Sequence, residues 1–309
     1  SGCTFVCKPA MQTPYSALAL AELATRAGIP PGVFSVITGD ARAVGGEITS
    51  NPLVKKLSFT GSTEIGKTLM AQCAGTIKKV SLELGGNAAV IVTADADLEY
   101  AAARCVRGGV VYGGQYCIGV QRILVHRSRF DAFRDELVKR VSACKVGDPL
   151  QEGIDVGPVI DERSARRIKD WIDEAVRTGA RVLVGGGQRG SIVEPTVLAN
   201  TAPGMKVEDE EIFGPVLTLN PYDTEDEALA RSNSSKYGLQ GGIFTNDLRL
   251  AFRALEDWDV GGLMVNDVPI YRIDNMPFGG WKQSGLGREG TRYAMEEMTD
   301  IKFLMINYS

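Results

Sequence analysis

Amphipathic stretches with helical spacing alternate with short apolar runs along the first third of the chain. The apolar positions within 17–24 recur at helical spacing, and we expect Thr13 to cap this helix with Pro14 as its first residue. The segments 33–38 and 56–60 are predicted strands, and a glycine turn that opens another helix follows the second at once. Strand, tight turn and helix in this order are typical of a parallel α/β sheet.

The same alternation continues along the rest of the chain. Further strands are expected at 79–84, 88–92, 122–126, 181–184, 216–219, 242–245 and 262–266, and helices at 97–111, 129–143, 164–178, 225–232 and 248–256. The glycine-dense segment 277–290 then precedes a short helix and a final strand at 302–306. Such a loop has the backbone freedom to wrap a site, with an ordinary surface connection as an equal alternative. The predicted fold class is therefore α/β.

Charge and composition favour a small-molecule ligand. The 309 residues include 38 acidic and 34 basic side chains, mixed along the chain without a long basic run. A nucleic-acid or anionic-membrane partner is therefore not expected. No stretch reaches the roughly 20 apolar residues that span a bilayer, and the first residues have no basic region of the signal-peptide type. We expect a cytoplasmic protein.

Histidine and cysteine usage narrows the chemistry. His126 is the only histidine, which argues against Ser-His-Asp and Cys-His catalysis and against multi-histidine metal sites. It is interpreted as a histidine at the end of a strand. The six cysteines have no metal-type spacing, and a domain of this size needs no disulfide bonds for stability, so reduced thiols are expected. One of these thiols is then available as a nucleophile.

Two early segments suit a nucleotide. Gly61 and Ser62 leave a predicted strand and open a helix, so backbone N–H groups and the positive end of the helix can meet a phosphate. The segment is not GxGxxG, and a βα turn that binds nothing is the commoner alternative. Lys8 can bond a ribose hydroxyl, whereas an isolated Lys-Pro pair is normally a solvated surface feature.

Cys117 and Glu83 are the two residues best suited to covalent chemistry. Cys117 follows a helical stretch and two glycines, where backbone N–H groups can face an oxyanion. Glu83 ends a predicted strand beside a Gly-Gly turn, where parallel sheets place ligand-facing side chains. The residues alone leave two alternatives open, an inert buried cysteine and an ion pair of Glu83 with Lys78 or Lys79. A thiolate nucleophile and a carboxylate that activates water are groups that an enzyme needs to oxidise an aldehyde through a thioester.

Ordered motifs extend over almost the whole chain. They are Lys8-Pro9-Ala10, the segments 59–66 and 82–87, Gly114-Gln115-Tyr116-Cys117, and the segments 210–216 and 277–280. In this order, with 34 positions from Glu83 to Cys117, the chain resembles the aldehyde dehydrogenases that use NAD or NADP. The resemblance implies an α/β fold with part of a Rossmann-like cofactor domain over 1–85 and a catalytic domain over 86–284. A tail over 285–309 is expected to return to the cofactor domain with an oligomerisation strand.

The resemblance also assigns roles to the candidate residues. Cys117 is expected to attack the aldehyde, with its backbone N–H as half of an oxyanion hole, and the resulting thiohemiacetal passes hydride to nicotinamide. Glu83 is expected to activate the water that hydrolyses the thioester. Cofactor contacts are expected from Lys8 and Glu211 to the two riboses, from Gly61 and Ser62 to the pyrophosphate, and from Phe213 to the nicotinamide. No metal is implied, because the cysteine supplies the nucleophile and the cofactor accepts the hydride.

Two features depart from the family pattern. The family has further residues ahead of Lys8, including the first strands of the cofactor sheet and an asparagine that completes the oxyanion hole. The chain is therefore interpreted as the carboxyl-terminal part of a longer enzyme, and its activity alone is left open. A non-catalytic relative that keeps the fold is the alternative function, and cofactor-free thioesterase or esterase action is a third. Met11 stands where many NAD-using relatives have a glutamate, so NADP is as acceptable as NAD.

The expected substrate is a small polar or anionic aldehyde. The stretch 11–86 is most similar to succinate-semialdehyde dehydrogenases, whereas 117–122 and 265–269 are more similar to lactaldehyde, non-phosphorylating glyceraldehyde-3-phosphate and phosphonoacetaldehyde types. Arg272 lies just before the glycine-dense loop and can receive a carboxylate or a phosphate, with an ion pair to Asp274 as the alternative. The resemblance also implies a homo-oligomer, either a dimer or a tetramer.

Overall fold

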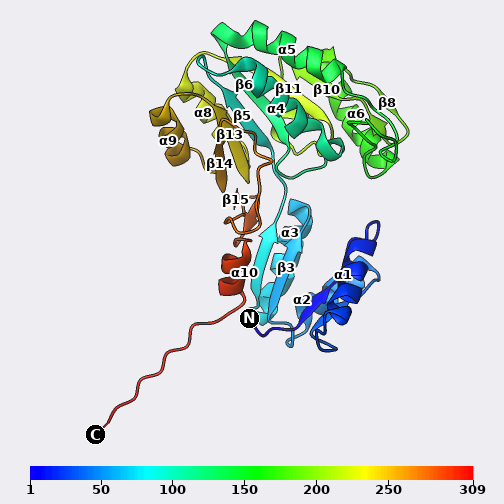
Figure 1. Cartoon of the computed structure of the whole chain (residues 1–309), viewed down its shortest axis with the longest axis vertical. Coiled ribbons are helices and arrows are strands. Elements are labelled where there is room, and N and C mark those ends of the chain that lie inside the picture. Colours follow the sequence, from blue (N-terminus) through cyan, green and yellow to red (C-terminus); the bar gives the residue numbers. More distant parts are fainter. Residues whose placement is uncertain (309) are drawn as a thin grey trace. The chain divides into compact units, whose positions relative to one another are not determined.

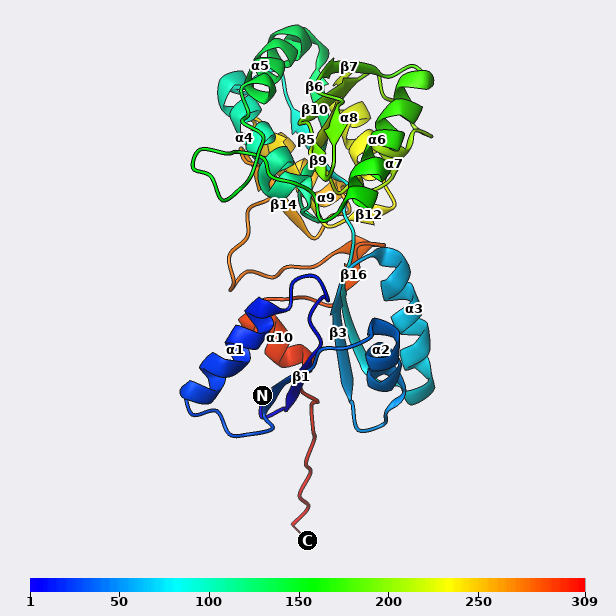
Figure 2. The same cartoon turned by 90° about the vertical axis from the view of Figure 1, so that its right-hand side faces the viewer.

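The computed structural model describes residues 1–308, which form two compact units (Figures 1 and 2). The first unit consists of 1–82, 274–277 and 287–308, and the second of 83–273 and 278–286. The sequence placed the boundaries at 85 and 284 and did not anticipate that 274–277 belongs with the first unit. In that unit the Met276 carbonyl lies so close to Gly290 that a Cβ there would be 2.4 Å from the oxygen.

The first unit contains short strands and helices in alternation. Its elements are β1 (Phe5–Cys7), α1 (Tyr15–Arg26), β2 (Phe34–Val36), α2 (Ala41–Ser50), β3 (Lys56–Thr60), α3 (Thr63–Cys73), η1 (Ala74–Thr76), β4 (Lys79–Glu83) and α10 (Thr291–Glu297). Strands β1 and β2 pair in parallel, and β3 neighbours β4. The last residue of β4, Glu83, is also the first residue of the second unit.

The start of α1 differs from the prediction. Pro14 is the N-cap, and no side chain caps the helix, so Thr13 is not its cap. The Pro14 carbonyl accepts the first helical hydrogen bond, from the Leu18 amide at 3.1 Å. Thr13 therefore lies one position too early, and its own amide bonds the carbonyl of Ala10.

The second unit is built on one seven-stranded sheet. Its elements are β5 (Ala88–Val92), α4 (Leu98–Val110), η2 (Val111–Gly114), β6 (Val120–His126), η3 (Arg127–Arg129), α5 (Phe130–Ser142), α6 (Glu162–Arg177), β7 (Arg181–Val184), β8 (Gln188–Arg189), β9 (Ile192–Val193), β10 (Thr196–Ala199), α7 (Lys206–Asp209), β11 (Val216–Tyr222), α8 (Glu225–Asn233), β12 (Tyr237–Gly238), β13 (Gln240–Phe244), α9 (Leu248–Asp257), β14 (Gly262–Val265), β15 (Trp281–Lys282) and β16 (Gly285–Leu286). The strand order is β14-β13-β5-β6-β11-β10-β7. All these pairs are parallel except β10 with β7. The α/β fold class is thus confirmed.

Alternation along the central strands creates two apolar layers, one on each face of the sheet. Val90 and Val92 of β5 pack with α4 and α5, whereas Ala89 and Ile91 pack with α8 and α9. Successive side chains of a strand point to opposite faces, so a strand covered by helices on both faces is a continuous apolar run. Figures 1 and 2 show these helices around the sheet. None of the helices in residues 1–308 is long and apolar enough to cross a membrane.

The predicted strand at 302–306 is absent from the structure. These residues form neither helix nor strand, and Ile301, Phe303 and Leu304 are strongly exposed. A strand requires a neighbouring backbone to pair with, and no described residue of this chain supplies one. The β propensity of the segment alone was therefore insufficient to make it a strand.

Candidate active site

Three loops meet at one edge of the seven-stranded sheet. They are the segments that precede β5, β6 and β11, and the strand register places them side by side, because Ala88 pairs with Val120 and Thr218 pairs with Arg122. These loops contain Cys117 and Glu211, and the segment before β5 begins at Glu83. The site residues of this unit therefore lie at the amino ends of parallel strands, whereas open α/β sheets usually bind ligands at the carboxyl ends.

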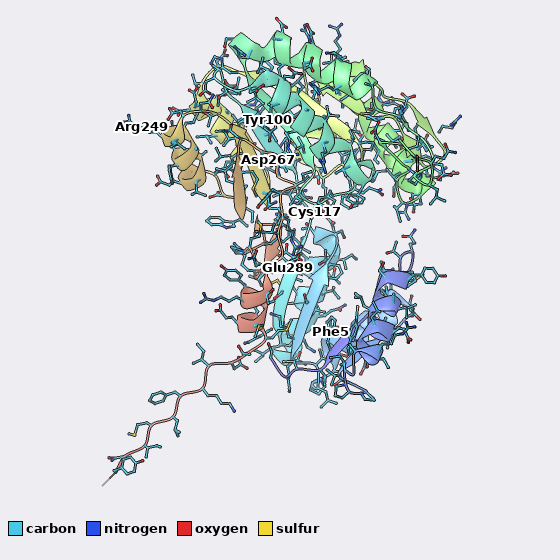
Figure 3. The ribbon with its side chains drawn as sticks, viewed as in Figure 1. Phe5, Tyr100, Cys117, Arg249, Asp267 and Glu289 are labelled. Atoms are coloured by element: carbon cyan, nitrogen blue, oxygen red, sulfur yellow. The ribbon has the colours of Figure 1, made fainter. Side chains whose placement is uncertain are left out.

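The loop before Cys117 has an unusual backbone. Tyr112, Gly113 and Gly114 all have left-handed φ values, of 53°, 65° and 70°. A side chain at Gly114 would be impossible without movement, because its Cβ would lie 2.1 Å from the carbonyl oxygen of Gly214. The Tyr112 and Tyr116 rings stack with centroids 5.5 Å apart across this turn. The turn is thus fixed at both ends, and Cys117 follows it at the edge of the unit (Figure 3).

Gly86 connects the Cys117 loop to Glu211. A Cβ at Gly86 would lie 2.0 Å from the carbonyl oxygen of Cys117, so only glycine permits this approach of the two backbones. The Gly86 amide donates a hydrogen bond to Oε1 of Glu211 at 2.8 Å. The nucleophile candidate and the Glu211 carboxylate therefore both contact one glycine.

The Cys117 thiol is half-buried beside two carboxylates. Burial, followed by the negative charges of Glu211 and Glu83, raises the pKa of Cys117 to about 11. Hydrogen bonds from the backbone amides of Cys117 and Ile118 act in the opposite direction. At neutral pH the thiol is therefore protonated, with two proton-accepting groups near it and two amides turned towards its sulfur.

Glu83 is 7% exposed, and the two lysines that precede it in the chain have partners of their own. The Lys78 ammonium donates to the carbonyls of Ile48 and Asn51, at 2.8 and 3.0 Å. The Lys79 ammonium forms an ion pair with Asp300 at 2.6 Å. Both lysines therefore bond groups within the first unit.

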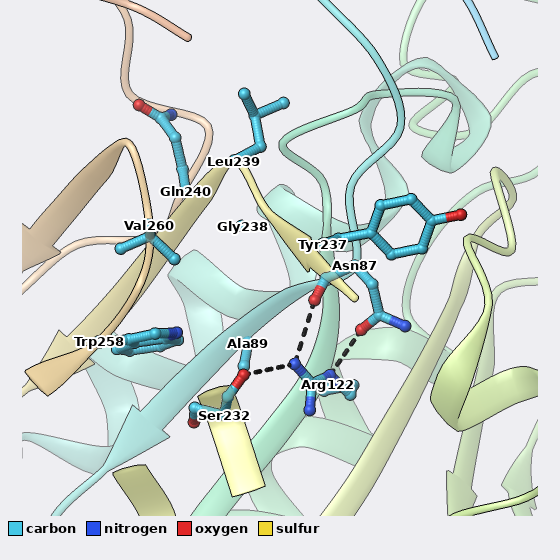
Figure 4. A pocket seen from close by; sticks show the side chains of 10 residues that line it. All are labelled: Asn87, Ala89, Arg122, Ser232, Tyr237, Gly238, Leu239, Gln240, Trp258 and Val260. Carbon is cyan, nitrogen blue, oxygen red and sulfur yellow. Dashed lines mark hydrogen bonds between the residues drawn. The ribbon is translucent and has the colours of Figure 1, made fainter. Parts of the chain in front are cut away.

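The sequence predicts a structural role for Arg122 near the cysteine, but sequence reasoning missed the rest of the buried polar network beneath these loops. Arg122, 4% exposed, donates to Oδ1 of Asn87 at 2.5 Å and to the carbonyls of Arg231 and Ser232 at 2.8 and 3.0 Å. Figure 4 shows Arg122 between Asn87 and Ser232. The Asn87 amide in turn donates to the carbonyl of Glu208 at 2.8 Å. The available signal was three polar residues next to apolar strand positions, namely Asn87, Gln121 and Arg122.

The structure distributes the predicted cofactor residues over both units. In the first unit, the Lys8 ammonium donates to the carbonyl of Pro9 at 2.9 Å, and Ser62 is the N-cap of α3, directly after Gly61. In the second unit, Glu211 is half-buried, and Phe213 is 39% exposed with a left-handed φ of 51°. Each unit therefore offers groups that suit parts of a nucleotide: an ammonium, a helix N-terminus, a carboxylate and an aromatic ring.

Arg272 lies over an aromatic ring near the nucleophile loop. Its guanidinium carbon is 4.7 Å from the centre of the Phe278 ring. Phe278 is buried with Ile118 and Leu239, and Tyr116 and Cys117 pack against the same cluster. Arg272 is thus linked to the Cys117 loop through one aromatic side chain.

The comparisons with known proteins all lead to one enzyme family. Residues 1–304 match the model of the aldehyde dehydrogenase family. The chain is 47% identical over 309 residues to the succinate-semialdehyde dehydrogenase [NADP(+)] GabD of Escherichia coli (strain K12), and 44% identical over 307 residues to a 3-sulfolactaldehyde dehydrogenase of Priestia aryabhattai. Each alignment covers 99% of this chain but 64% of the relative.

A solved structure gives the same result. The crystal structure of an NADP-dependent enzyme of E. coli matches with a TM-score of 0.97 at 46% identity. The alignment covers 99% of this chain and 64% of the solved chain. The chain therefore spans less than two thirds of the relatives it matches.

Proposed function

The chain belongs to the aldehyde dehydrogenase family, and from this we propose that it oxidises a small aldehyde with an anionic end to the carboxylic acid, with NAD or NADP as hydride acceptor. The observation that carries the proposal is the placement of the Cys117 thiol beside the Glu83 and Glu211 carboxylates. Two relatives are named for succinate semialdehyde and for 3-sulfolactaldehyde, aldehydes with a carboxylate and a sulfonate. One of them is named as NADP-dependent.

The thiol begins the reaction as the nucleophile. A neighbouring carboxylate, Glu83 or Glu211, takes the thiol proton and passes it to solvent. Sγ of Cys117 attacks the aldehyde carbon, and the electron pair of the carbonyl π bond moves to oxygen as an oxyanion. The backbone amides of Cys117 and Ile118, which already face the sulfur, are available to stabilise this charge. When bound, the nicotinamide supplies the acceptor for the hydride of the former aldehyde C–H. A thioester on Cys117 remains.

Glu83 completes the turnover as a general base. It takes a proton from a water molecule, whose oxygen attacks the thioester carbon, and the C–S bond breaks to return the thiolate and release the acid. Its 7% exposure keeps competing bulk water away from the carboxylate. After burial and Glu211, the charge of Glu83 also raises the pKa of Cys117, and the same carboxylate can accept a proton.

The residues present fit the cofactor. The Glu211 carboxylate, held by the Gly86 amide, has an acceptor geometry suited to the hydroxyls of a ribose. Ser62 caps the 11-residue helix α3, whose positive N-terminal end suits a pyrophosphate. Met11 is 70% exposed and uncharged, so the expectation that a 2′-phosphate is tolerated remains part of the proposal.

Glu83→Gln tests the base and the covalent intermediate together. In this variant, incubated with succinate semialdehyde and NADP, we expect turnover to fall by about 10²–10⁴-fold because the amide cannot take the proton. The acyl group should then accumulate on Cys117, which intact-mass and peptide mass spectrometry detect. The exposed Glu152→Gln is the matched control and should behave as wild type. Rapid deacylation by Glu83→Gln would remove Glu83 from this role.

Arg272 is proposed to bind the anionic end of the substrate. Arg272→Ala should raise KM for succinate semialdehyde by about 10–100-fold, since a charge-assisted hydrogen bond contributes about 1.5–3 kcal/mol. KM for butanal, which has no anion, should hardly change, and Arg272→Lys should keep part of the preference. Equal losses for both aldehydes would indicate a structural role, through Phe278 or through Asp274.

The tail is proposed to pair with a second copy in a homo-oligomer. The side chains of 301, 303–306 and 308 are apolar or aromatic and strongly exposed in the single chain. Their burial against a partner removes this surface from water. Sedimentation of a chain ended at residue 300 should give a smaller species than the intact chain, and an unchanged mass would contradict the proposal.

A further inference from the structure

A buried side chain after the nucleophile clamps the backbone around Glu211. The side chain of Gln121 accepts a hydrogen bond from the Ile212 amide at 3.0 Å and donates to the Glu210 carbonyl at 2.7 Å. These two groups flank Glu211 on either side in the chain. Gln121 also donates to the carbonyl of Val207 at 3.1 Å and is 6% exposed. A single amide therefore fixes the segment at three points.

Other side chains hold the same segment from different directions. Asn87 donates to the Glu210 carbonyl at 3.2 Å, and the guanidinium of Arg167 in α6 donates to the Ile212 carbonyl at 2.7 Å. The Lys236 ammonium pairs with the Glu210 carboxylate at 2.6 Å. Among these contacts, only those of Gln121 reach both peptide groups next to Glu211 from the strand that follows Cys117.

We propose that Gln121 is a positioning residue, which holds the Glu211 carboxylate against Gly86 and beside the Cys117 thiol. The bond from the Gly86 amide to Glu211 and the close approach of Gly86 to the Cys117 carbonyl define that position. The inference rests on the proposed function only for the role of Glu211 towards the cofactor. The expected effect of Gln121 on the Cys117 thiol does not depend on whether the chain turns over an aldehyde.

The sign of the expected effect follows from the charges around the thiol. Burial, followed by the charges of Glu211 and Glu83, raises the pKa of Cys117, while Arg167 and Lys236 are cations near the Glu211 segment. If the clamp is lost and Glu211 moves away, one anion is removed from the thiol and the pKa falls. At a pH below the pKa of the thiol, the fraction present as thiolate increases about tenfold for each unit by which that pKa falls.

The test measures alkylation of Cys117 by iodoacetamide as a function of pH, with peptide mass spectrometry to separate it from the other thiols. In Gln121→Met, which keeps the volume but makes no such hydrogen bonds, the rate at pH 8 should rise by about three- to tenfold, and the pH profile should shift to lower pH. Glu211→Gln should produce the same shift. Adding Gln121→Met to Glu211→Gln should then change the rate no further, because the first residue acts through the second.

Two further variants separate positioning from general loss of packing. Thr218→Val changes a fully buried residue of β11 whose hydroxyl has no partner among residues 1–308, and its alkylation profile should match wild type. Gln121→Asn keeps an amide but is one methylene too short to span both peptides, so it should shift the profile in the same direction. It also serves if Gln121→Met fails to fold.

NADPH binding, followed by its fluorescence, provides the second readout. Gln121→Met should weaken binding about tenfold, and no more than Glu211→Gln alone. If wild type binds no NADPH but the alkylation shift and its dependence on Glu211 persist, the proposed function fails and the clamp stands. An unshifted alkylation profile in both Gln121 variants overturns the clamp, whether or not the chain oxidises aldehydes.

Discussion

Replacing Cys117 by alanine should reduce the aldehyde-dependent formation of reduced nicotinamide by at least about 10⁴-fold. The reason is chemical, since alanine has no group that can form the bond to the aldehyde carbon, and the remaining amides and carboxylates only bind. The measurement is the absorbance of reduced nicotinamide with succinate semialdehyde and NADP. Cys117→Ser should fall almost as far, because a hydroxyl is a far weaker nucleophile at its ordinary pKa.

Cys144→Ala is the matched control for that loss. Cys144 is another half-buried thiol of the second unit, whose sulfur contacts the carbonyl of Arg140 at 3.6 Å. Its replacement should leave the rate close to wild type. If Cys117→Ala retained the wild-type rate, the covalent mechanism would be wrong. The alternative of a non-catalytic relative predicts that wild type itself forms no reduced nicotinamide although it keeps the fold.

Gly86→Ala should damage both stability and activity. The new Cβ would lie 2.0 Å from the carbonyl oxygen of Cys117, so the two loops must separate. Overpacking of this kind costs about 1–3 kcal/mol of unfolding free energy. The separation also moves the thiol and breaks the amide bond to Glu211, and a misplacement of about 1 Å can cost about 100-fold in rate. Urea unfolding and steady-state rates measure the two effects.

Gly46→Ala provides the comparison for a glycine without such a contact. Gly46 lies inside α2, and a Cβ there would meet nothing within 4 Å. This substitution should stabilise the chain by up to about 1 kcal/mol, because alanine has the higher helix propensity. Wild-type activity and stability in Gly86→Ala would show that the Cys117 loop is not held at this contact.

Much of the fold could be predicted from the sequence because its strands are either apolar runs or alternations of apolar and polar residues. The predicted strands at 56–60, 88–92 and 181–184 coincide with β3, β5 and β7. The run Thr196–Ala199 was missed although all four residues are buried in β10, because periodicity does not distinguish a fully buried strand from a segment of a buried helix. The predicted strand at 302–306 was wrong for another reason: a segment with favourable β propensity still needs a partner strand to pair with.

Some residues of the candidate site could likewise be suggested from the sequence, and others could not. Cys117, Glu83 and Glu211 could be proposed from motifs as nucleophile, base and cofactor ligand, because such proposals depend on residue types at fixed spacing. The supporting bonds of Gln121 and Asn87 could not, since both side chains bond mainly to backbone atoms far away in the chain. Backbone acceptors have no residue-type signature, so no motif marks them.

The sequence by itself determined the family, the α/β class and the residues available for chemistry, because all three depend on residue types and their order. Only the tertiary structure decided that the loops of Cys117 and Glu211 meet at the amino edge of the sheet, with Gly86 between them. It also decided that the pKa of Cys117 is raised rather than lowered. Burial and the distances between charges set that direction, and both arise only when segments far apart in the chain pack together.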